Sequence, residues 1–276
     1  MKKVQIHFYI PELIQLAIHH THCAIEMLQD LEANTSKKVH ELRVVCKRLR
    51  SYHRSFKPLL PDKSVSSRHD KVLKGVAESL SQNRESYVNF KLIGSFEEST
   101  EDPQNKAFFN QLKAQFDSLV ISDVIDKTDL LVAFEAENVY WKSIEIDSLA
   151  LDKACQGLEQ TYDKARKLAK IALKHSLSME ETHQWRKWSK YFMYQLEPII
   201  NKSNKQLGYV KALETLTNAQ GKLHDLHVLQ QIVQGEKLSL EENNRVLNDL
   251  QKRQITLEAK IIDGYHSCFP GKRLDI

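Results

Sequence analysis

"KKVHELRVVCKRLRSYHRSFK", residues 37–57, has the spacing of an amphipathic helix with an unusually basic face. Its cationic or protonatable side chains follow one another at intervals of three, four, three and four residues: His40, Arg43, Lys47, Arg50 and Arg54. Because helical residues advance by about 100° each, these five side chains occupy an arc of roughly 80°. The apolar residues fall on a separate face. The segment therefore predicts a helix with one side in a core and a basic stripe beside it.

A second segment, "HQWRKWSKYFMY" (183–194), repeats the pattern. Three positions correspond, with the first-half residue given first: His40 and His183, Arg43 and Arg186, Lys47 and Lys190. Downstream, "LSQNRESYV" (80–88) aligns with "QGKLHDLHV" (220–228). An internal duplication of a four-helix unit explains both matches. We expect a single domain with a first half of about 1–145 and a second half of about 146–276.

The composition favours an all-α protein. Gly 8 and Pro 6 are few for 276 residues, against usual shares of roughly 7% and 5%. Helical periodicity predicts eight helices, at about 11–32, 37–57, 66–92, 104–140, 148–175, 179–203, 205–233 and 240–266. The segment "VQIHFYI" (4–10) is either a short strand or an apolar arm, and 94–103 is expected to be an acidic loop.

Several local signals place the helix ends. Pro11 suits the first turn of a helix, because its missing N–H would have no partner there. Ser178 with Glu181, and Ser239 with Glu242, have the S-x-x-E spacing of a capping box. These pairs predict helices that begin at about 179 and 240.

Charge and cysteine usage are typical of a cytoplasmic protein. Lys+Arg 40 against Asp+Glu 36 gives a net charge of +4, which still allows a strong local field. The four cysteines form no C-x-x-C pair, so we expect free thiols in a reducing compartment. No apolar run approaches the ~18 residues of a membrane span, and no apolar leader is present.

The basic stripe has two interpretations. A solvated helix face normally interleaves charges of opposite sign at i,i+4, because like charges there repel. The first stripe contains no carboxylate, and the pattern recurs in the second half. A matching anion would offset the repulsion. An acidic partner chain and a polyanionic ligand both remain open at this point.

The motifs resemble those of the CHAD family, the conserved histidine α-helical domain. The resemblance rests on "HELRVVCKRLR" (40–50), "GLEQTYDKAR" (157–166), "HQWRKWSKYFMY", "QGKLHDLHV" and "YHSCFPGKRL" (265–274), in this order, over about 11–276. It implies two four-helix bundles related by pseudo-twofold symmetry, with a basic central cleft. It also implies non-catalytic binding of inorganic polyphosphate, a linear phosphate polymer, and a location at polyphosphate granules.

The candidate binding residues combine the two stripes with two residues of the "GLEQTYDKAR" segment. Arginine offers a planar fork and lysine a compact charge, and both suit phosphate oxygens. The predicted polyphosphate-binding residues are His40, Arg43, Lys47, Arg50, Arg54, Tyr162, Arg166, His183, Arg186, Lys187 and Lys190. Arg84, Asp225 and Tyr194 are expected to support them. Packing within the bundle is an equally good interpretation for the two histidines and for Tyr162 and Arg166.

The sequence gives little sign of catalysis. A di-iron bundle needs two E-x-x-H motifs, and only Glu180 with His183 forms one. There is no P-loop and no G-x-G-x-x-G. We therefore expect no catalytic residue, metal or cofactor. The alternative function is a scaffold that docks an acidic or phosphorylated protein or a nucleic-acid backbone. Nucleic acid is the weaker of these, because no aromatic residues are interleaved along the first stripe as stacking platforms.

Overall fold

All the regular secondary structure among the described residues is helical. The structure, a computed structural model, describes residues 3–31, 35–81, 85–117, 127–146, 153–202, 204–236 and 238–271. Its elements are α1 (Lys3–Gln29), α2 (Thr35–Phe56), η1 (Lys57–Leu59), α3 (Lys63–Ser79), α4 (Glu85–Ser99), α5 (Pro103–Asp117), α6 (Lys127–Lys142), α7 (Gln156–Lys174), α8 (Met179–Gln195), η4 (Glu197–Lys202), α9 (Asn204–Gly235) and α10 (Leu240–Cys268). The all-α prediction is confirmed. No helix in the described ranges is both long enough and apolar enough to span a membrane.

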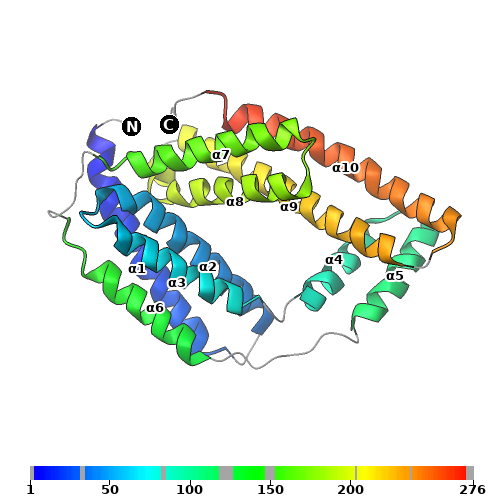
Figure 1. Ribbon diagram of the computed structural model, residues 1–276, viewed down its shortest axis with the longest axis horizontal. Helices are drawn as coiled ribbons and strands as arrows, with labels where there is room; N and C mark the ends of the chain where they lie inside the picture. Colours follow the sequence, from blue (N-terminus) through cyan, green and yellow to red (C-terminus); the bar gives the residue numbers. More distant parts are fainter. Residues whose placement is uncertain are drawn as a thin grey trace.

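The helices form two packed groups (Figure 1). The first group contains α1, α2, α3 and α6, in which α1 packs against α2 and α6 while α2 packs against α3. The second contains α7, α8, α9 and α10, each packed against the next. Fully buried side chains fill the first group, among them Leu13, Leu42, Leu49 and Trp141. The apolar face predicted for 37–57 is thus part of the core.

The two groups meet where α2 crosses α8, over small and polar buried side chains. The Tyr9 hydroxyl lies 2.8 Å from Ser55 Oγ and donates to the carbonyl of Gln195 at 3.1 Å. The Gln195 amide donates in turn to the carbonyl of Ser51 at 2.8 Å. All four residues are fully buried. This network holds α1, α2 and the end of α8 in one arrangement, because each bond links two different helices and two of the three bonds join the two halves.

A glycine allows α7 to begin close to α2. A Cβ placed on Gly157 would lie 2.3 Å from the Ser55 carbonyl oxygen and 2.6 Å from Ser55 Cα. No real Cβ comes so close to backbone, so only glycine fits here. The first residue of the "GLEQTYDKAR" segment is therefore explained by packing.

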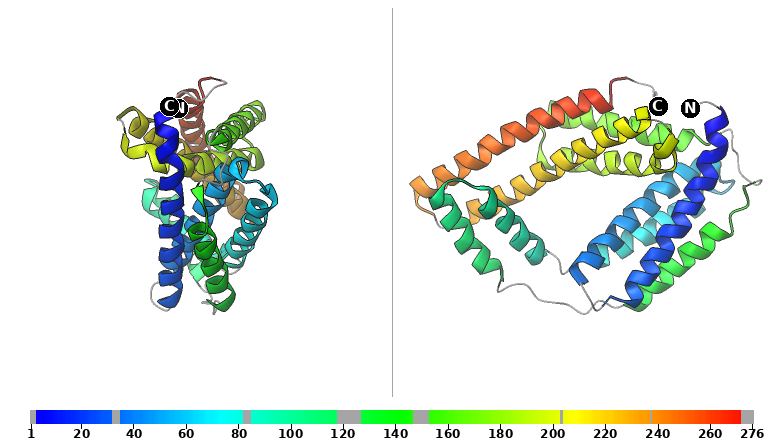
Figure 2. Two further views of the ribbon diagram at one scale, coloured as in Figure 1. Left: turned by 90° about the vertical axis from the view of Figure 1, so that its left-hand side faces the viewer. Right: turned by 180° about the vertical axis from the view of Figure 1, so that it is seen from behind.

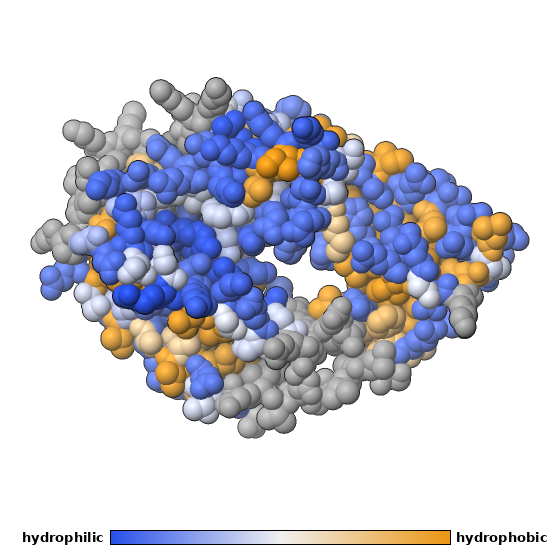
Figure 3. Space-filling model, viewed as in Figure 1, coloured by the Kyte–Doolittle hydropathy of each residue, from blue (hydrophilic) through white to orange (hydrophobic). Residues whose placement is uncertain are grey.

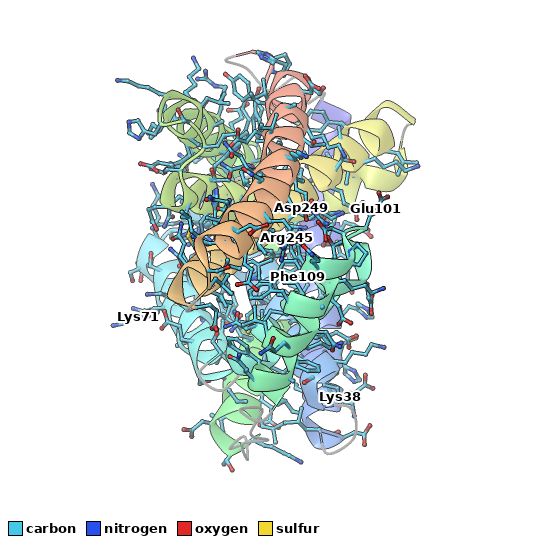
Figure 4. All side chains as sticks on the ribbon, turned by 90° about the vertical axis from the view of Figure 1, so that its right-hand side faces the viewer. Lys38, Lys71, Glu101, Phe109, Arg245 and Asp249 are labelled. Carbon is cyan, nitrogen blue, oxygen red and sulfur yellow. The ribbon has the colours of Figure 1, made fainter. Side chains whose placement is uncertain are left out.

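The α4–α5 hairpin leaves the first group and reaches the far ends of α9 and α10 (Figure 2). Arg253 of α10 donates to Ser99 Oγ at 2.7 Å and to the Ser99 carbonyl at 3.1 Å. Arg245 Nε donates to Asn105 Oδ1 at 3.0 Å. Figure 4 shows Arg245 and Asp249 of α10 beside the loop that carries Glu101. Figure 3 shows open space between this hairpin and the first group.

Several expected boundaries are wrong. Helix α1 begins at Lys3, so Pro11 lies inside it and residues 4–10 are neither strand nor arm. Tyr9 and Ile10 are fully buried, and their burial offsets the hydrogen bond lost at the proline. The expected helix 66–92 is two helices, α3 and α4. Most of the expected acidic loop, 94–103, is helical up to Ser99.

Other local predictions are confirmed. The Ser239 side chain accepts from the Glu242 N–H while the Glu242 side chain accepts from the Ser239 N–H, which completes that capping box. At the start of α8 one bond of the predicted capping box is recorded, in which the Ser178 side chain accepts from the Glu181 N–H, while the Glu181 carboxylate pairs with His175. The expected helix 104–140 is described as α5 and α6, and residues 118–126 between them lie outside the described residues, as does the predicted supporting residue Arg84. The four cysteines are free thiols.

Candidate anion-binding site

The two basic helices lie side by side. Helix α2, which carries the first stripe, packs directly against α8, which carries the second (Figure 1). Residues separated by more than a hundred positions in the chain are therefore neighbours along this contact.

Arg43 and Arg186 make matching contacts in the two halves. Arg43 Nη1 donates to the carbonyl of Ala77 in α3 at 2.7 Å, and Arg186 Nε donates to the carbonyl of Thr217 in α9 at 3.0 Å. Ala77 and Thr217 have the same place in the predicted alignment of the two halves, since each lies three residues before the segments that begin at 80 and 220. Each arginine ties its helix to the following one. Both side chains therefore stabilise the packing of two helices in addition to contributing positive charge.

Asp70 of α3 neutralises part of the first stripe. Arg50 Nε lies 3.0 Å from Asp70 Oδ1, and Arg54 uses both terminal nitrogens, with Nη2 3.0 Å from Asp70 Oδ2. Burial acts to raise the pKa of Asp70, but the hydrogen bonds and charges of Arg54 and Arg50 outweigh it and lower that pKa. The stripe itself contains no carboxylate, as the sequence shows. A neighbouring helix supplies one, which sequence spacing does not reveal.

Aromatic rings of α8 lie against the same arginines. The Arg54 guanidinium is 4.6 Å from the ring centroid of Tyr191 and 5.5 Å from that of Trp188. Arg50 is 5.8 Å from the Tyr191 centroid. Such cation–π contacts hold the guanidinium groups in place. Aromatic residues therefore do accompany the stripe, but they come from the other half of the chain.

The lysines of α8 lie among other cations. Burial lowers the pKa of Lys187, and the charges of Arg50 and Arg54 lower it further, against a smaller opposing contribution from Glu180. Burial, Arg186 and Arg48 lower the pKa of Lys190, against an opposing contribution from Glu214. Repulsion between cations from both halves therefore acts on both lysines. An anion in contact with them would relieve that repulsion.

A cavity of about 350 Å³ lies at the C-terminal end of α2. It combines cations, hydroxyl groups, one aromatic ring and one carboxylate: Arg54, Lys57, Lys164, Ser66, Ser67, Thr161, Trp188 and Asp70 are among its lining residues. Lys57 Nζ donates to Ser67 Oγ at 2.9 Å, whereas the Ser66 and Thr161 hydroxyls donate to backbone carbonyls. The ammonium groups of the cavity suit phosphate oxygens. Of these lining residues, only Arg54 was a candidate from the sequence, because the others come from η1, α3, α7 and α8.

The two motif histidines are both exposed. His40 lies near the start of α2, three residues before Arg43, and Lys47 further along is half-buried. His183 lies 5.4 Å from His224, centroid to centroid. Burial, His224 and Lys187 lower the pKa of His183, which favours its neutral form at neutral pH. In that form the ring is a weaker phosphate ligand than the sequence suggested.

Tyr162 and Arg166 occupy positions within the packing of α7. Tyr162 is 2% exposed, and its hydroxyl donates to the carbonyl of Gly271 at 2.9 Å. Arg166 Nη2 lies 3.6 Å from Asp163 Oδ1. These contacts support the packing interpretation for Tyr162. Its role as a ligand stays a prediction.

Two predicted supporting residues lie near cations of the site. Tyr194 is buried, and the Arg48 guanidinium is 5.2 Å from its ring centroid. Asp225 is exposed at the level of the whole residue. Desolvation of its carboxyl raises the pKa above the ordinary value, and the charges of His224 and Arg186 oppose this only in part. Asp225 forms no ion pair with another described residue, so its expected role of orienting a cation stays a prediction.

Comparison with known proteins assigns the family. No curated protein matches the chain. The sequence profile of the CHAD domain matches residues 19–234, which include α2, α8 and most of both helix groups. The C-terminal segment 265–274, which also resembles the family, lies beyond the matched residues. With a profile match over most of its length, the chain belongs to the CHAD domain family.

Proposed function

We propose that this protein binds inorganic polyphosphate on the surface formed by α2 and α8, without hydrolysing it. The observation that carries the proposal is the packing of α2 against α8, which brings Arg50 and Arg54 of the first half close to Lys187 of the second. Cations from both halves thus gather where the two helix groups meet. Polyphosphate is the ligand that the family resemblance implies.

The chemistry of the surface fits a linear polyanion. Each phosphate carries roughly one negative charge, and cations grouped on one surface attract it together where a single exposed pair would add little. Lys187 and Lys190 supply ammonium groups. In the cavity, Lys57 and Lys164 add charge. A polymer that follows α8 from Lys190 to Lys187 would pass Arg54 and reach this cavity. In our proposal, these residues and the cavity together form a continuous basic cleft.

Titration of the pure protein tests the proposal. We expect long-chain polyphosphate to bind more tightly than duplex DNA of equal charge, with an affinity that falls as salt rises. Lys187→Ala with Lys190→Ala should weaken binding at least tenfold and flatten the salt dependence. Lys106→Ala with Lys260→Ala removes the same charge from exposed positions on α5 and α10 and should have little effect. Equal losses in the two double variants would refute a localised site.

The same titration addresses the alternatives. Equal affinity for DNA and polyphosphate would favour a general polyanion surface, such as one that docks an acidic or phosphorylated protein. Release of orthophosphate that follows the pure protein would refute binding without hydrolysis. A labelled copy of the chain should collect at polyphosphate granules in cells, and the Lys187/Lys190 variant should not.

A further inference from the structure

Three helices of the first group bring two histidines and a glutamate together. His53 of α2, His69 of α3 and Glu137 of α6 each offer a ligand atom, and these atoms all lie within 4.8 Å of one another. His53 Nε2 is 2.8 Å from Glu137 Oε2, and His69 Nδ1 is 2.6 Å from Glu137 Oε1. In the described part of the chain this is the one place where three such groups meet. Neither motif histidine belongs to the cluster.

The carboxylate at its centre is buried and lacks a strong cationic partner. Glu137 is 1% exposed and His53 is fully buried. Each oxygen of its carboxylate lies within hydrogen-bond distance of one imidazole, His53 on one side and His69 on the other. Its ion-pair partners among the described residues are these two histidines, with no lysine or arginine. A buried charge normally requires a charged partner or a metal ion.

The surroundings have features of a metal site's outer layer. Trp141 Nε1 donates to Glu137 Oε2 at 3.2 Å, and Ser66 Oγ donates to the carbonyl of His53 at 2.6 Å. The Tyr140 hydroxyl is buried and has no hydrogen-bond partner, although its ring centroid lies 4.2 Å from that of His69. The side chain of His69 is 23% exposed, which gives the cluster one opening to solvent.

We propose that His53, His69 and Glu137 bind a divalent transition-metal ion, and that Zn²⁺ fits them best. Two nitrogens and one carboxylate oxygen form a three-ligand set that leaves a fourth position for water. With bonds of about 2.0–2.1 Å, ligand atoms in such a tetrahedron lie about 3.4 Å apart. The histidines contact different oxygens of Glu137, so with one carboxylate oxygen as ligand only one of the two N···O distances is an edge of the tetrahedron, and that edge lengthens by less than 1 Å. A metal-bound water on the open side would give the Tyr140 hydroxyl a partner.

The sequence did not suggest this site because its ligands share no local motif. They come from three helices, and the predicted helix ends gave no reason to place α6 against α2 and α3. The metal would hold these three helices together. One of its ligands, His69, directly precedes Asp70, whose carboxylate pairs with Arg50 and Arg54 of the basic stripe. The proposal does not depend on polyphosphate binding.

Calorimetry on the full-length, chelator-treated protein tests the site with Zn²⁺ alone. We expect one Zn²⁺ per chain and a higher melting temperature with the metal. Co²⁺ in its place should give the visible absorption of a four-coordinate site. His69→Gln and Glu137→Gln should each weaken Zn²⁺ binding at least 100-fold. His175→Gln is the matched control, because His175 forms an exposed pair with Glu181 at 2.9 Å, and it should leave the affinity unchanged.

Specific outcomes would overturn the proposal. Absence of Zn²⁺ binding would do so, as would binding that survives His69→Gln in a folded protein. If the buried Glu137→Gln variant fails to fold, the partly exposed His69 variant decides the matter, with circular dichroism as the check on folding. Loss of binding in the His175 variant would assign the metal to the exposed pair instead.

Discussion

At the scale of single residues, Asp70 controls how much charge α2 presents. It accepts hydrogen bonds from both Arg50 and Arg54, two of the five cations of the first stripe. Part of the positive charge of the stripe is therefore neutralised within the fold. An external anion must compete with Asp70 for these guanidinium groups.

Replacing this carboxylate should strengthen polyphosphate binding. Asp70→Asn keeps the shape of the side chain but removes its charge, which frees Arg50 and Arg54 for phosphate oxygens. We expect a several-fold gain in affinity and a steeper salt dependence, measured by fluorescence titration. Asp263→Asn makes the same charge change at an exposed position of α10 and controls for net charge. Equal gains in the two variants would mean that Arg50 and Arg54 take no direct part.

Glu197 should make stability depend on pH. Burial acts to raise its pKa, but His20, Arg48 and Tyr52 together lower it below the ordinary value of 4.5. A depressed pKa stabilises the fold fully above about pH 4.5, and this stabilisation is lost as the pH falls through the folded-state pKa. Glu197→Gln should cost about 1–3 kcal/mol at neutral pH. Urea unfolding should show that the gap between variant and wild type narrows in acid, and a constant gap would contradict this.

At the scale of elements, the approach of α7 to α2 depends on the missing side chain of Gly157. The α7 backbone reaches Ser55, the residue whose hydroxyl also takes part in the buried network between the halves. Helix α7 also carries Thr161 and Lys164 of the cavity. The closeness of two backbones therefore sets the position of cavity residues.

Gly157→Ala should destabilise the fold. The added Cβ meets backbone atoms, which have no rotamer to change, so α7 must shift away from α2. We expect a loss of about 1–3 kcal/mol in chemical denaturation. Gly75→Ala is the control, because a Cβ on this α3 residue meets nothing within 4 Å. Alanine is the better helix former, so that variant should gain about 0.5–1 kcal/mol. Similar values for both variants would rule out the packing explanation.

The helices themselves were largely predictable, because their signals are local. The α2 and α8 patterns, and the caps at Ser178 and Ser239, depend on neighbours three or four residues away. The extension of α1 past Pro11 was not predictable, since burial of Tyr9 and Ile10 by other elements decides it. The same holds for Asp70 and for the cavity. The residues that they contact come from separate helices, and no residue spacing along the chain predicts which helices pack together.

At the scale of the whole molecule, the α4–α5 hairpin belongs to the first half of the sequence but contacts the second helix group. Its sequence lies between α3 and α6, yet Arg245 and Arg253 of α10 hold it at the far end. The Arg253 guanidinium also lies 5.2 Å from the ring centroid of Phe96. The division into consecutive halves at about residue 145 does not describe this contact, because it joins a segment of the first half to the last helix.

Arg253→Ala should loosen the hairpin without unfolding the rest. The variant loses two hydrogen bonds to Ser99 and the contact with Phe96. Hydrogen exchange should quicken in α4 and α5, while α2 and α8 keep their protection. Lys260→Ala removes an exposed α10 charge as the control. Uniformly faster exchange in every helix would show that the hairpin does not open as a separate unit.

The route of the chain through the hairpin also governs the order of assembly during synthesis. Helix α1 leaves the ribosome first, but its main partner α6 follows only after the whole hairpin has been made. Ile93 and Phe109 of the hairpin are fully buried in the finished protein, although α9 and α10 are synthesised last. The nascent chain therefore carries uncovered apolar surface on α1 until α6 has emerged and on the hairpin until α9 and α10 have emerged, and such surface recruits chaperones or other nascent chains. A shortened product that stops before α10 would lack the cover for its own hairpin.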